Sequence, residues 1–190
     1  MQRLIVLSSC LFVSCFAGPT IHRIAAGKQE DDASELASTA LAFDITYSAS
    51  LATFKCFKQL QYTVAFIRAY NGDFQGQIDP YSVSNIQNAA AAGLGTEVFM
   101  TPQPTSSKSG SQQFDEMYNM LTGANINVKS VWVQVVSPSD WTTSSTTNIN
   151  FLNSILARAS QYDLTIGVYT SKKEWNTITD HAMTRNVRLW

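Results

Sequence analysis

The chain has 190 residues, of which 45% are hydrophobic, and 13 basic residues nearly balance 14 acidic ones, giving a net charge of -1. This length predicts one domain with a sizeable core, and the near-neutral charge excludes a protein that binds nucleic acid through a basic surface. The sequence contains no glycine-rich phosphate loop and no Cys/His cluster of metal-ligand spacing, so we expect neither a cofactor nor a metal.

Residues 1–17 have the features of a secretory signal peptide. Arg3 supplies a positive charge, an apolar run follows from Leu4 to Phe16, and Cys15 and Ala17 form a small-residue cleavage pattern. A membrane-spanning helix needs about 20 apolar residues, and no later run approaches that length. We therefore expect cleavage before Gly18 and a secreted, extracellular protein that does not contact membranes.

Residues 18–39 are polar and aperiodic, which predicts a flexible leader. Short apolar runs then alternate with amphipathic segments, so we assign residues 40–190 to one domain. Strands are predicted at 41–48, 63–70, 95–102, 130–138, 165–171 and 187–190. Helices are predicted at 50–62, 83–93, 111–123, 148–163 and 172–179.

This alternation predicts an α/β fold with parallel strands and crossover helices, either an open sheet or a (β/α) barrel. No G-x-G-x-x-G follows the first strand. Polar residues instead follow or end the strands, where the active sites of barrel enzymes lie. These residues are Asp44, Arg68, Gln103, Ser137 and Thr170. We therefore favour a barrel.

Six predicted strands do not close an eight-stranded barrel. The chain is then either a smaller open fold or a barrel that is incomplete at its C-terminus, and we expect the second. Cys56 is the one cysteine that follows the signal peptide. In a secreted protein, an unpaired cysteine indicates either a partner in a missing part or a buried thiol, and both interpretations stay open.

Six ordered segments carry a family pattern: AFDITYSAS, FKCFKQLQY, VAFIRAY, IDPYSVSNIQNAAAAGLGTEVFMTPQP, VWVQVVSPSDW and IGVYTSKKEW. Together they resemble the glycoside hydrolase family 25 lysozymes in their invertebrate, secreted form, from about residue 41 to the end. The resemblance implies a modified (β/α) barrel that cleaves bacterial peptidoglycan between N-acetylmuramic acid and N-acetylglucosamine, in digestion or innate immunity. It also implies further strands after the fifth helix, which supports truncation.

Glycoside hydrolysis needs a proton donor and a second carboxylate. The resemblance assigns one carboxylate to the end of the first strand, where Asp44 stands, although a strand-end capping role is the alternative. It assigns an Asp-x-Glu pair to the fourth strand, where this chain has Gln134 and Val136. Gln134 can hydrogen-bond a sugar, but Val136 cannot donate a proton, so the acid/base position is lost.

Other carboxylates could replace the missing acid. Asp140 follows the fourth strand and is our candidate for a second catalytic residue beside Asp44. Glu97 lies on the third strand, and the sequence leaves open which side of the sheet it faces. Asp79 precedes Pro80, which favours a role in a turn.

Aromatic residues near the strand ends suit a sugar-binding cleft, because flat rings pack on pyranose faces. Core packing is the alternative for each of them, and Trp132 is expected in the interior. Arg68 could hold a substrate carboxylate or pair with Asp44 or Asp79. The substrate-binding candidates are Gln134, Arg68, Tyr47, Tyr70, Tyr169 and Trp141.

Two hypotheses follow from these residues. The first is a secreted N-acetylmuramidase with a displaced acid. The second is a catalytically inactive pseudoenzyme that binds carbohydrate or another partner. In both, we expect a monomer whose partner is bacterial peptidoglycan or a related glycan.

Overall fold

A parallel sheet runs through the structure, a computed structural model that describes residues 40–184 and 188–189. The expected signal peptide and leader lie outside the described residues. The strands lie in the order β1 (Leu41–Ile45), β2 (Tyr62–Asn71), β4 (Gly95–Met100), β5 (Ser130–Gln134), β6 (Thr165–Tyr169) and β7 (Arg188–Leu189). Each neighbouring pair is parallel, and β3 (Gln77–Ile78) adds an antiparallel pairing to the end of β2.

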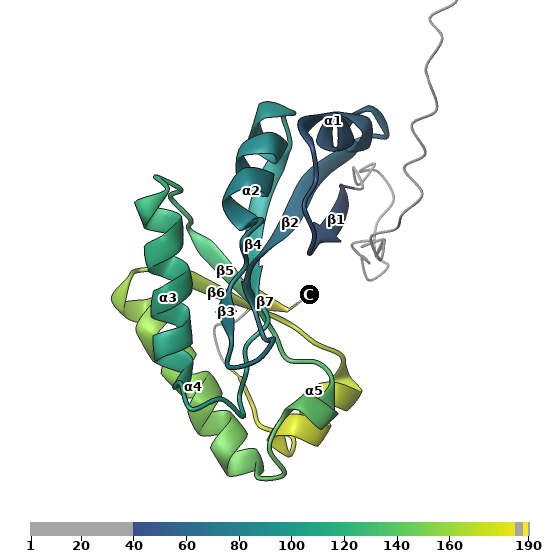
Figure 1. The fold of residues 1–190 in the computed structure, drawn as a ribbon. Helices are drawn as coiled ribbons and strands as arrows, with labels where there is room; N and C mark the ends of the chain where they lie inside the picture. The colour runs from purple at the N-terminus through teal and green to yellow at the C-terminus, as the bar shows by residue number, and fades with distance from the viewer. Residues whose placement is uncertain (1–39, 185–187, 190) are drawn as a thin grey trace, which may run out of the picture.

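Helices connect these parallel strands. They are α1 (Leu51–Gln59), α2 (Ser82–Ala91), α3 (Gly110–Gly123), α4 (Ser145–Gln161) and α5 (Lys172–Thr179). The sheet curls, and helices pack on its outer face (Figure 1). Within the described residues the result is a half-barrel, which confirms the predicted α/β fold of barrel type.

Serine side chains set where four of the helices begin. Ser50, Ser109, Ser144 and Ser171 each accept a backbone N–H from the residue three positions on, which satisfies a donor that the first turn leaves unpaired. At the other end of α2, Gly93 has a φ of +77°, a conformation that glycine adopts without strain. The predicted helices are therefore confirmed, with ends that differ by a few residues.

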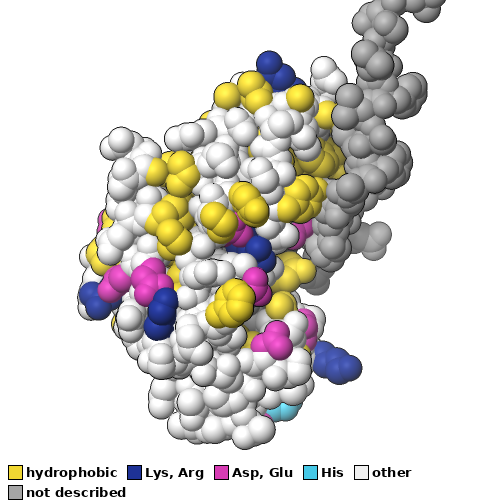
Figure 2. All heavy atoms as spheres, in the orientation of Figure 1, with side chains coloured by type: hydrophobic (Ala, Val, Ile, Leu, Met, Phe, Trp, Pro, Cys, Tyr) yellow, Lys and Arg dark blue, Asp and Glu magenta, His cyan; other side chains and the backbone are white. Residues whose placement is uncertain are grey.

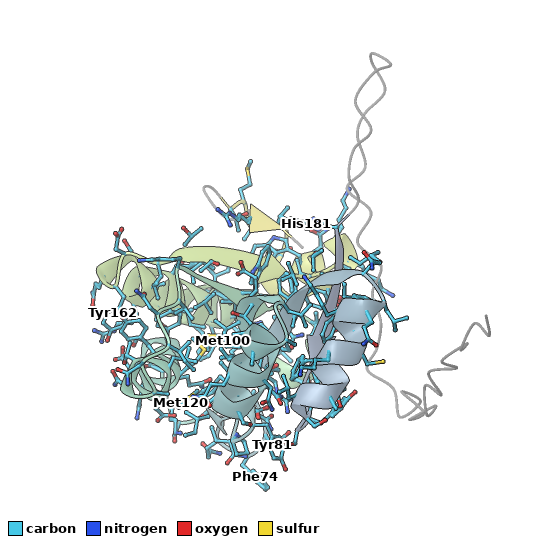
Figure 3. The ribbon with its side chains drawn as sticks, turned by 90° about the horizontal axis from the view of Figure 1, so that it is seen from above. Phe74, Tyr81, Met100, Met120, Tyr162 and His181 are labelled. Carbon is cyan, nitrogen blue, oxygen red and sulfur yellow. The ribbon has the colours of Figure 1, made fainter. Side chains whose placement is uncertain are left out.

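The hydrophobic core lies between the outer face of the sheet and the helices. Phe43 of β1 stacks on Phe57 of α1 with ring centroids 4.0 Å apart, and Tyr62 meets both rings edge-on at 5.4 Å. Met100 lies in this interior, whereas Phe74 lies at the periphery with 86% of its surface exposed (Figure 3). Burying each large apolar side chain contributes about 1.5–3 kcal/mol, so this layer is the main source of stability.

Two segments differ from the prediction. The segment between the predicted strand at 63–70 and the predicted helix at 83–93 contains β3, which pairs Ile78 with Tyr70. The strand expected at 130–138 ends at Gln134, because Ser137 adopts a left-handed φ of 53° and a 3-10 turn, η1 (Pro138–Asp140), follows. Cys56 is half-buried on α1, and its pairing stays an open prediction.

Charges of both signs mix on the surface over α3 (Figure 2). Lys108 pairs with Glu116 at 2.8 Å, and Arg158 pairs with Asp115 at 3.3 Å. Such exposed pairs contribute at most about 1 kcal/mol each. Across the part of the chain that the structure describes, no helix has the length and apolar character needed to cross a membrane.

Candidate functional site

Aromatic side chains fill the concave side of the half-barrel. Phe66 of β2 and Trp132 of β5 meet edge to face, with centroids 5.7 Å apart. Phe99 of β4 is in register with Trp132 and only 1% exposed. On β6, a Cβ added to Gly167 would lie 2.3 Å from the Trp132 ring, so glycine makes room for the indole. We call Phe66, Phe99 and Trp132 the aromatic floor.

A ring of polar side chains lies above this floor, at the carboxyl ends of the strands. Because side chains alternate along a strand, residues i and i+2 share a face, and a polar residue follows each floor residue by two positions. Asp44 faces the same side, since its neighbours Phe43 and Ile45 are buried in the core. The polar ring consists of Asp44, Arg68, Thr101, Gln134 and Tyr169. Barrel enzymes carry their active sites at this end.

Arg68 forms an ion pair with Asp79. The sequence had left a substrate carboxylate, Asp44 and Asp79 open as its partners. Its Nε donates to Asp79 Oδ2 at 2.8 Å, and an Nη donates to the carbonyl of Thr46 at 3.1 Å. The Asp79 side chain is 2% exposed and also accepts the backbone N–H of Tyr81. Asp79 therefore has two roles. It stabilises the turn, as predicted, and it holds the Arg68 guanidinium at the rim.

Gln134 stands on β5 at the position where the resemblance expects an aspartate. Its Oε1 accepts a hydrogen bond from Thr101 Oγ1 at 2.7 Å. Val136, two residues on, is half-buried, and its carbonyl accepts the indole N–H of Trp141. This part of the ring thus offers amide and hydroxyl groups and no acid.

Tyr169 lies in a negative environment. Burial raises the pKa of its phenol, and the carboxylates of Asp44 and Glu174 raise it further. The phenol therefore stays protonated at neutral pH and acts as a hydrogen-bond donor.

Glu174 is a carboxylate near the ring that the sequence reasoning missed. Its Oε2 accepts from Ser171 Oγ at 2.7 Å, and its Oε1 accepts the backbone N–H of Ser137 at 3.0 Å. These hydrogen bonds hold the pKa of Glu174 below its usual value. The S-x-x-E pattern at Ser171–Glu174 is the capping-box signal that would have identified it.

The two substitute acids that the sequence suggested differ in their surroundings. Asp140 is exposed in η1, where its carboxylate accepts a hydrogen bond from Ser139 Oγ at 3.4 Å. Glu97 faces the concave side, which answers the open question about its direction. Its Oε2 accepts from Ser130 Oγ at 2.7 Å and from Trp132 Nε1 at 3.1 Å, so it supports the aromatic floor from near the start of β5.

Two aromatic candidates need correction, because their rings are buried. An irregularity in the β2–β4 register between Arg68 and Tyr70 turns Tyr70 toward the helices, where it is 0% exposed and donates to Glu116 at 2.9 Å. Trp141 is 7% exposed and packs edge-on against Phe151 of α4. Neither ring offers a face to a sugar.

Tyr47 also packs mainly against the core, since its half-buried ring adjoins the buried cluster. Within residues 40–184 and 188–189, no three His, Cys, Asp or Glu side chains gather as metal ligands do. Arg68, Gln134 and Tyr169 are the substrate-binding candidates that remain at the rim, with Asp44 beside them.

The family model and the similar proteins of known sequence indicate the same family. The family model described as lysozyme-like protein 1 matches residues 35–190. Lysozyme-like protein 1 of Caenorhabditis elegans is 47% identical over 156 residues, which cover 81% of this chain and 52% of that protein. Lysozyme-like protein 2 of the same organism is 40% identical over 200 residues, covering 100% of this chain and 72% of that protein.

A relative from a different organism is similar as well. Probable GH family 25 lysozyme 2 of Dictyostelium discoideum is 36% identical over 136 residues, covering 71% of this chain and 62% of that protein. This chain spans only about half the length of the first two relatives it matches, lysozyme-like proteins 1 and 7 of C. elegans.

Solved structures share the fold at low sequence identity. A family 25 glycosyl hydrolase from Bacillus anthracis has a TM-score of 0.56 at 14% identity, covering 77% of this chain and 67% of that one. The modular autolysin LytC from Streptococcus pneumoniae, solved with a synthetic peptidoglycan ligand, has a TM-score of 0.56 at 12% identity. It covers 74% of this chain and 34% of that one.

Proposed function

Since the chain belongs to the lysozyme-like protein 1 family of glycoside hydrolase family 25 type, we propose that it is a secreted protein that binds the glycan strands of bacterial peptidoglycan. The glycan would lie across the polar ring at the mouth of the half-barrel. The biological setting would be defence against bacteria or their digestion.

The observation that carries this proposal is the polar ring above the aromatic floor. Gln134, Arg68 and Tyr169 supply hydrogen-bond donors, Asp44 supplies a carboxylate, and the half-buried ring of Trp132 supplies an apolar base. Sugars present hydroxyl edges and apolar faces, and they bind to this combination of groups.

Binding is favoured over hydrolysis because the ring lacks a proton donor of the expected kind. The acid position is Val136, Asp140 is exposed in η1, and Glu97 supports Trp132. Glu174 is ionised at neutral pH, since its pKa is lowered, so it is a poor general acid. Hydrolysis by Asp44 with a second carboxylate is the alternative function.

Co-sedimentation with insoluble peptidoglycan tests the binding proposal. We expect the secreted chain to sediment with peptidoglycan and to stay in solution with cellulose. Asp44→Asn should weaken binding about fivefold or more, because it removes a charge-assisted acceptor. Asp140→Asn is the matched control and should bind like the unmodified chain. Equal sedimentation with both polymers, or with neither, would overturn the proposal.

A turbidity assay on bacterial cell walls separates binding from hydrolysis. We expect no clearance. Clearance that Asp44→Asn abolishes would instead establish the alternative, a muramidase that works without an acid at position 136.

Expression in a eukaryotic secretory host tests the export proposal. Mass spectrometry of the protein recovered from the medium should give Gly18 as the first residue. Retention of the whole chain inside the cells would contradict secretion.

A further inference from the structure

A pocket opens at the amino ends of β4 and β5, at the other end of the strands from the polar ring. Its volume is about 240 Å³, and its walls come from the start of β4, the loop before β5 and α2, which packs beside β4 (Figure 1). Sites for drug-sized ligands have volumes of roughly 300–1,000 Å³. The pocket therefore suits a smaller molecule.

Glu97 gives this pocket a negative charge that no cation balances within the described residues. Its Oε2 accepts from Ser130 Oγ at 2.7 Å and from Trp132 Nε1 at 3.1 Å, and both donors are neutral. In the same part of the chain, no Lys, Arg or His forms an ion pair with Glu97, and no group donates to its Oε1. A half-buried carboxylate with one unused oxygen favours a cationic ligand group.

Lys129 brings the opposite charge to the same pocket. It is exposed directly before β5, and its backbone carbonyl accepts the N–H of Thr165 at 3.0 Å, which fixes the point from which the side chain extends. Lys129 and Glu97 line one pocket without forming an ion pair with each other. A ligand that is only a cation would be repelled by the Lys129 ammonium. The ligand that satisfies both side chains therefore carries an ammonium and a carboxylate.

The remaining wall of the pocket is largely aliphatic. Ile86 of α2 lines it together with Ile126 and Val128 of the loop before β5. Ile126 and Val128 also pack against the core, which holds them in place. An aliphatic group of the ligand would leave water on contact with this wall.

We propose that this pocket binds a free α-amino acid with an aliphatic side chain. The α-ammonium donates to Glu97 Oε1, the α-carboxylate pairs with Lys129, and the side chain lies against the aliphatic wall. The site does not depend on the proposed function. It is connected to the aromatic floor through Glu97, because the same carboxylate accepts the indole N–H of Trp132.

Titration of the secreted chain with L-leucine, followed by NMR, tests the proposal. We expect a dissociation constant of about 1 mM or tighter, with amide shift changes concentrated at residues 96–98 and 126–130, which line the pocket. N-acetyl-leucine lacks the ammonium and should bind about tenfold more weakly. Leucinamide lacks the carboxylate and should bind about threefold more weakly, because Lys129 is exposed. Glycine lacks the side chain and should bind about tenfold more weakly.

Two variants assign the charges to their partners. Glu97→Gln keeps an acceptor for Ser130 and Trp132 but removes the charge, so it should weaken leucine binding about tenfold. In Lys129→Met, leucine and leucinamide should bind alike, a change of ratio that a merely structural effect would not produce. Lys55→Met, an exposed lysine of α1 outside the pocket, is the matched control and should keep the ratio of the unmodified chain. Thermal unfolding verifies that each variant is folded, and Lys129→Met keeps the test decisive if Glu97→Gln does not fold.

The proposal would be overturned by any of several results. One is that leucine does not bind, and another is that leucinamide or N-acetyl-leucine binds as tightly as leucine. Shift changes confined to the carboxyl ends of the strands would place the ligand in the mouth and would also overturn it. Unchanged leucine binding in folded Glu97→Gln would do the same. None of these results bears on sedimentation with peptidoglycan, because the two sites lie at opposite ends of the strands.

Discussion

At the scale of single residues, the contact between Gly167 and Trp132 makes the aromatic floor sensitive to one methyl group. Gly167→Ala would place a Cβ 2.3 Å from the indole. We expect it to lower the free energy of unfolding by about 1–3 kcal/mol, as overpacked cores do. Urea unfolding followed by tryptophan fluorescence measures this change.

Gly123 provides the matched control for that substitution. A Cβ added there would meet nothing within 4 Å, and alanine favours the helical backbone over glycine. Gly123→Ala should therefore leave stability unchanged or raise it by up to about 1 kcal/mol. Equal effects of the two variants would contradict the proposed packing.

Arg68 and Asp79 form the second residue-scale test. Arg68→Met would leave the Asp79 carboxylate, which is 2% exposed, without its cation. We expect a loss of about 2–3 kcal/mol, less than for a fully buried pair because the Arg68 side chain is 21% exposed. The double variant Arg68→Met/Asp79→Leu should recover part of this loss. A Thr46→Ala substitution leaves the accepting carbonyl in place and serves as the control.

At the scale of elements, Glu174 ties the loop after β5 to the start of α5. Its carboxylate accepts from Ser137 and Ser171, so the folded state holds the pKa of Glu174 below the unfolded value. The ionised form therefore stabilises the fold. This contribution is complete above the unfolded pKa and is lost as the pH falls through the folded pKa.

Glu174→Gln should accordingly cost about 1 kcal/mol at pH 7, and the difference from the unmodified chain should shrink as the pH falls below about 4.3. Ser171→Ala keeps the carboxylate but removes one of its donors, so it should show the same trend with a smaller amplitude. Denaturant unfolding at a series of pH values measures both. A difference that stays constant down to pH 3 would argue against this role.

At the scale of the whole molecule, strand order predicts how protection from hydrogen exchange is distributed. β2 and β4 each pair with a parallel strand on both sides, and their central residues are buried. Among the described residues, β1 pairs with β2 alone. Amides of Ala65–Ile67 and Val98–Met100 should exchange most slowly, at rates set by global unfolding, and those of β1 should exchange faster.

Hydrogen exchange measured by mass spectrometry checks this order. The same experiment at several protein concentrations is the control, because pairing between copies would protect β1 more as the concentration rises. Protection of β1 equal to that of β4 at low concentration would contradict the pairing described.

Much of the fold was predictable because its signals are local. The period-2 and period-3.6 patterns identified six of the seven strands and all five helices that the structure describes, since each pattern depends on neighbours within a few positions. The short β3 was missed because two residues are too few to show a period. The segment pattern also identified the family and the unusual residues Gln134 and Val136.

The sequence by itself thus determined the order of the elements, the half-barrel class and the chemical types gathered at the strand ends. Only the tertiary structure decided which of these groups meet. The contacts of Arg68 with Asp79, Thr101 with Gln134 and Ser137 with Glu174 join residues 11, 33 and 37 positions apart. The irregular register between β2 and β4 likewise places the Tyr70 side chain in the core. Contacts at such separations depend on strand register and loop path, which no local periodicity encodes.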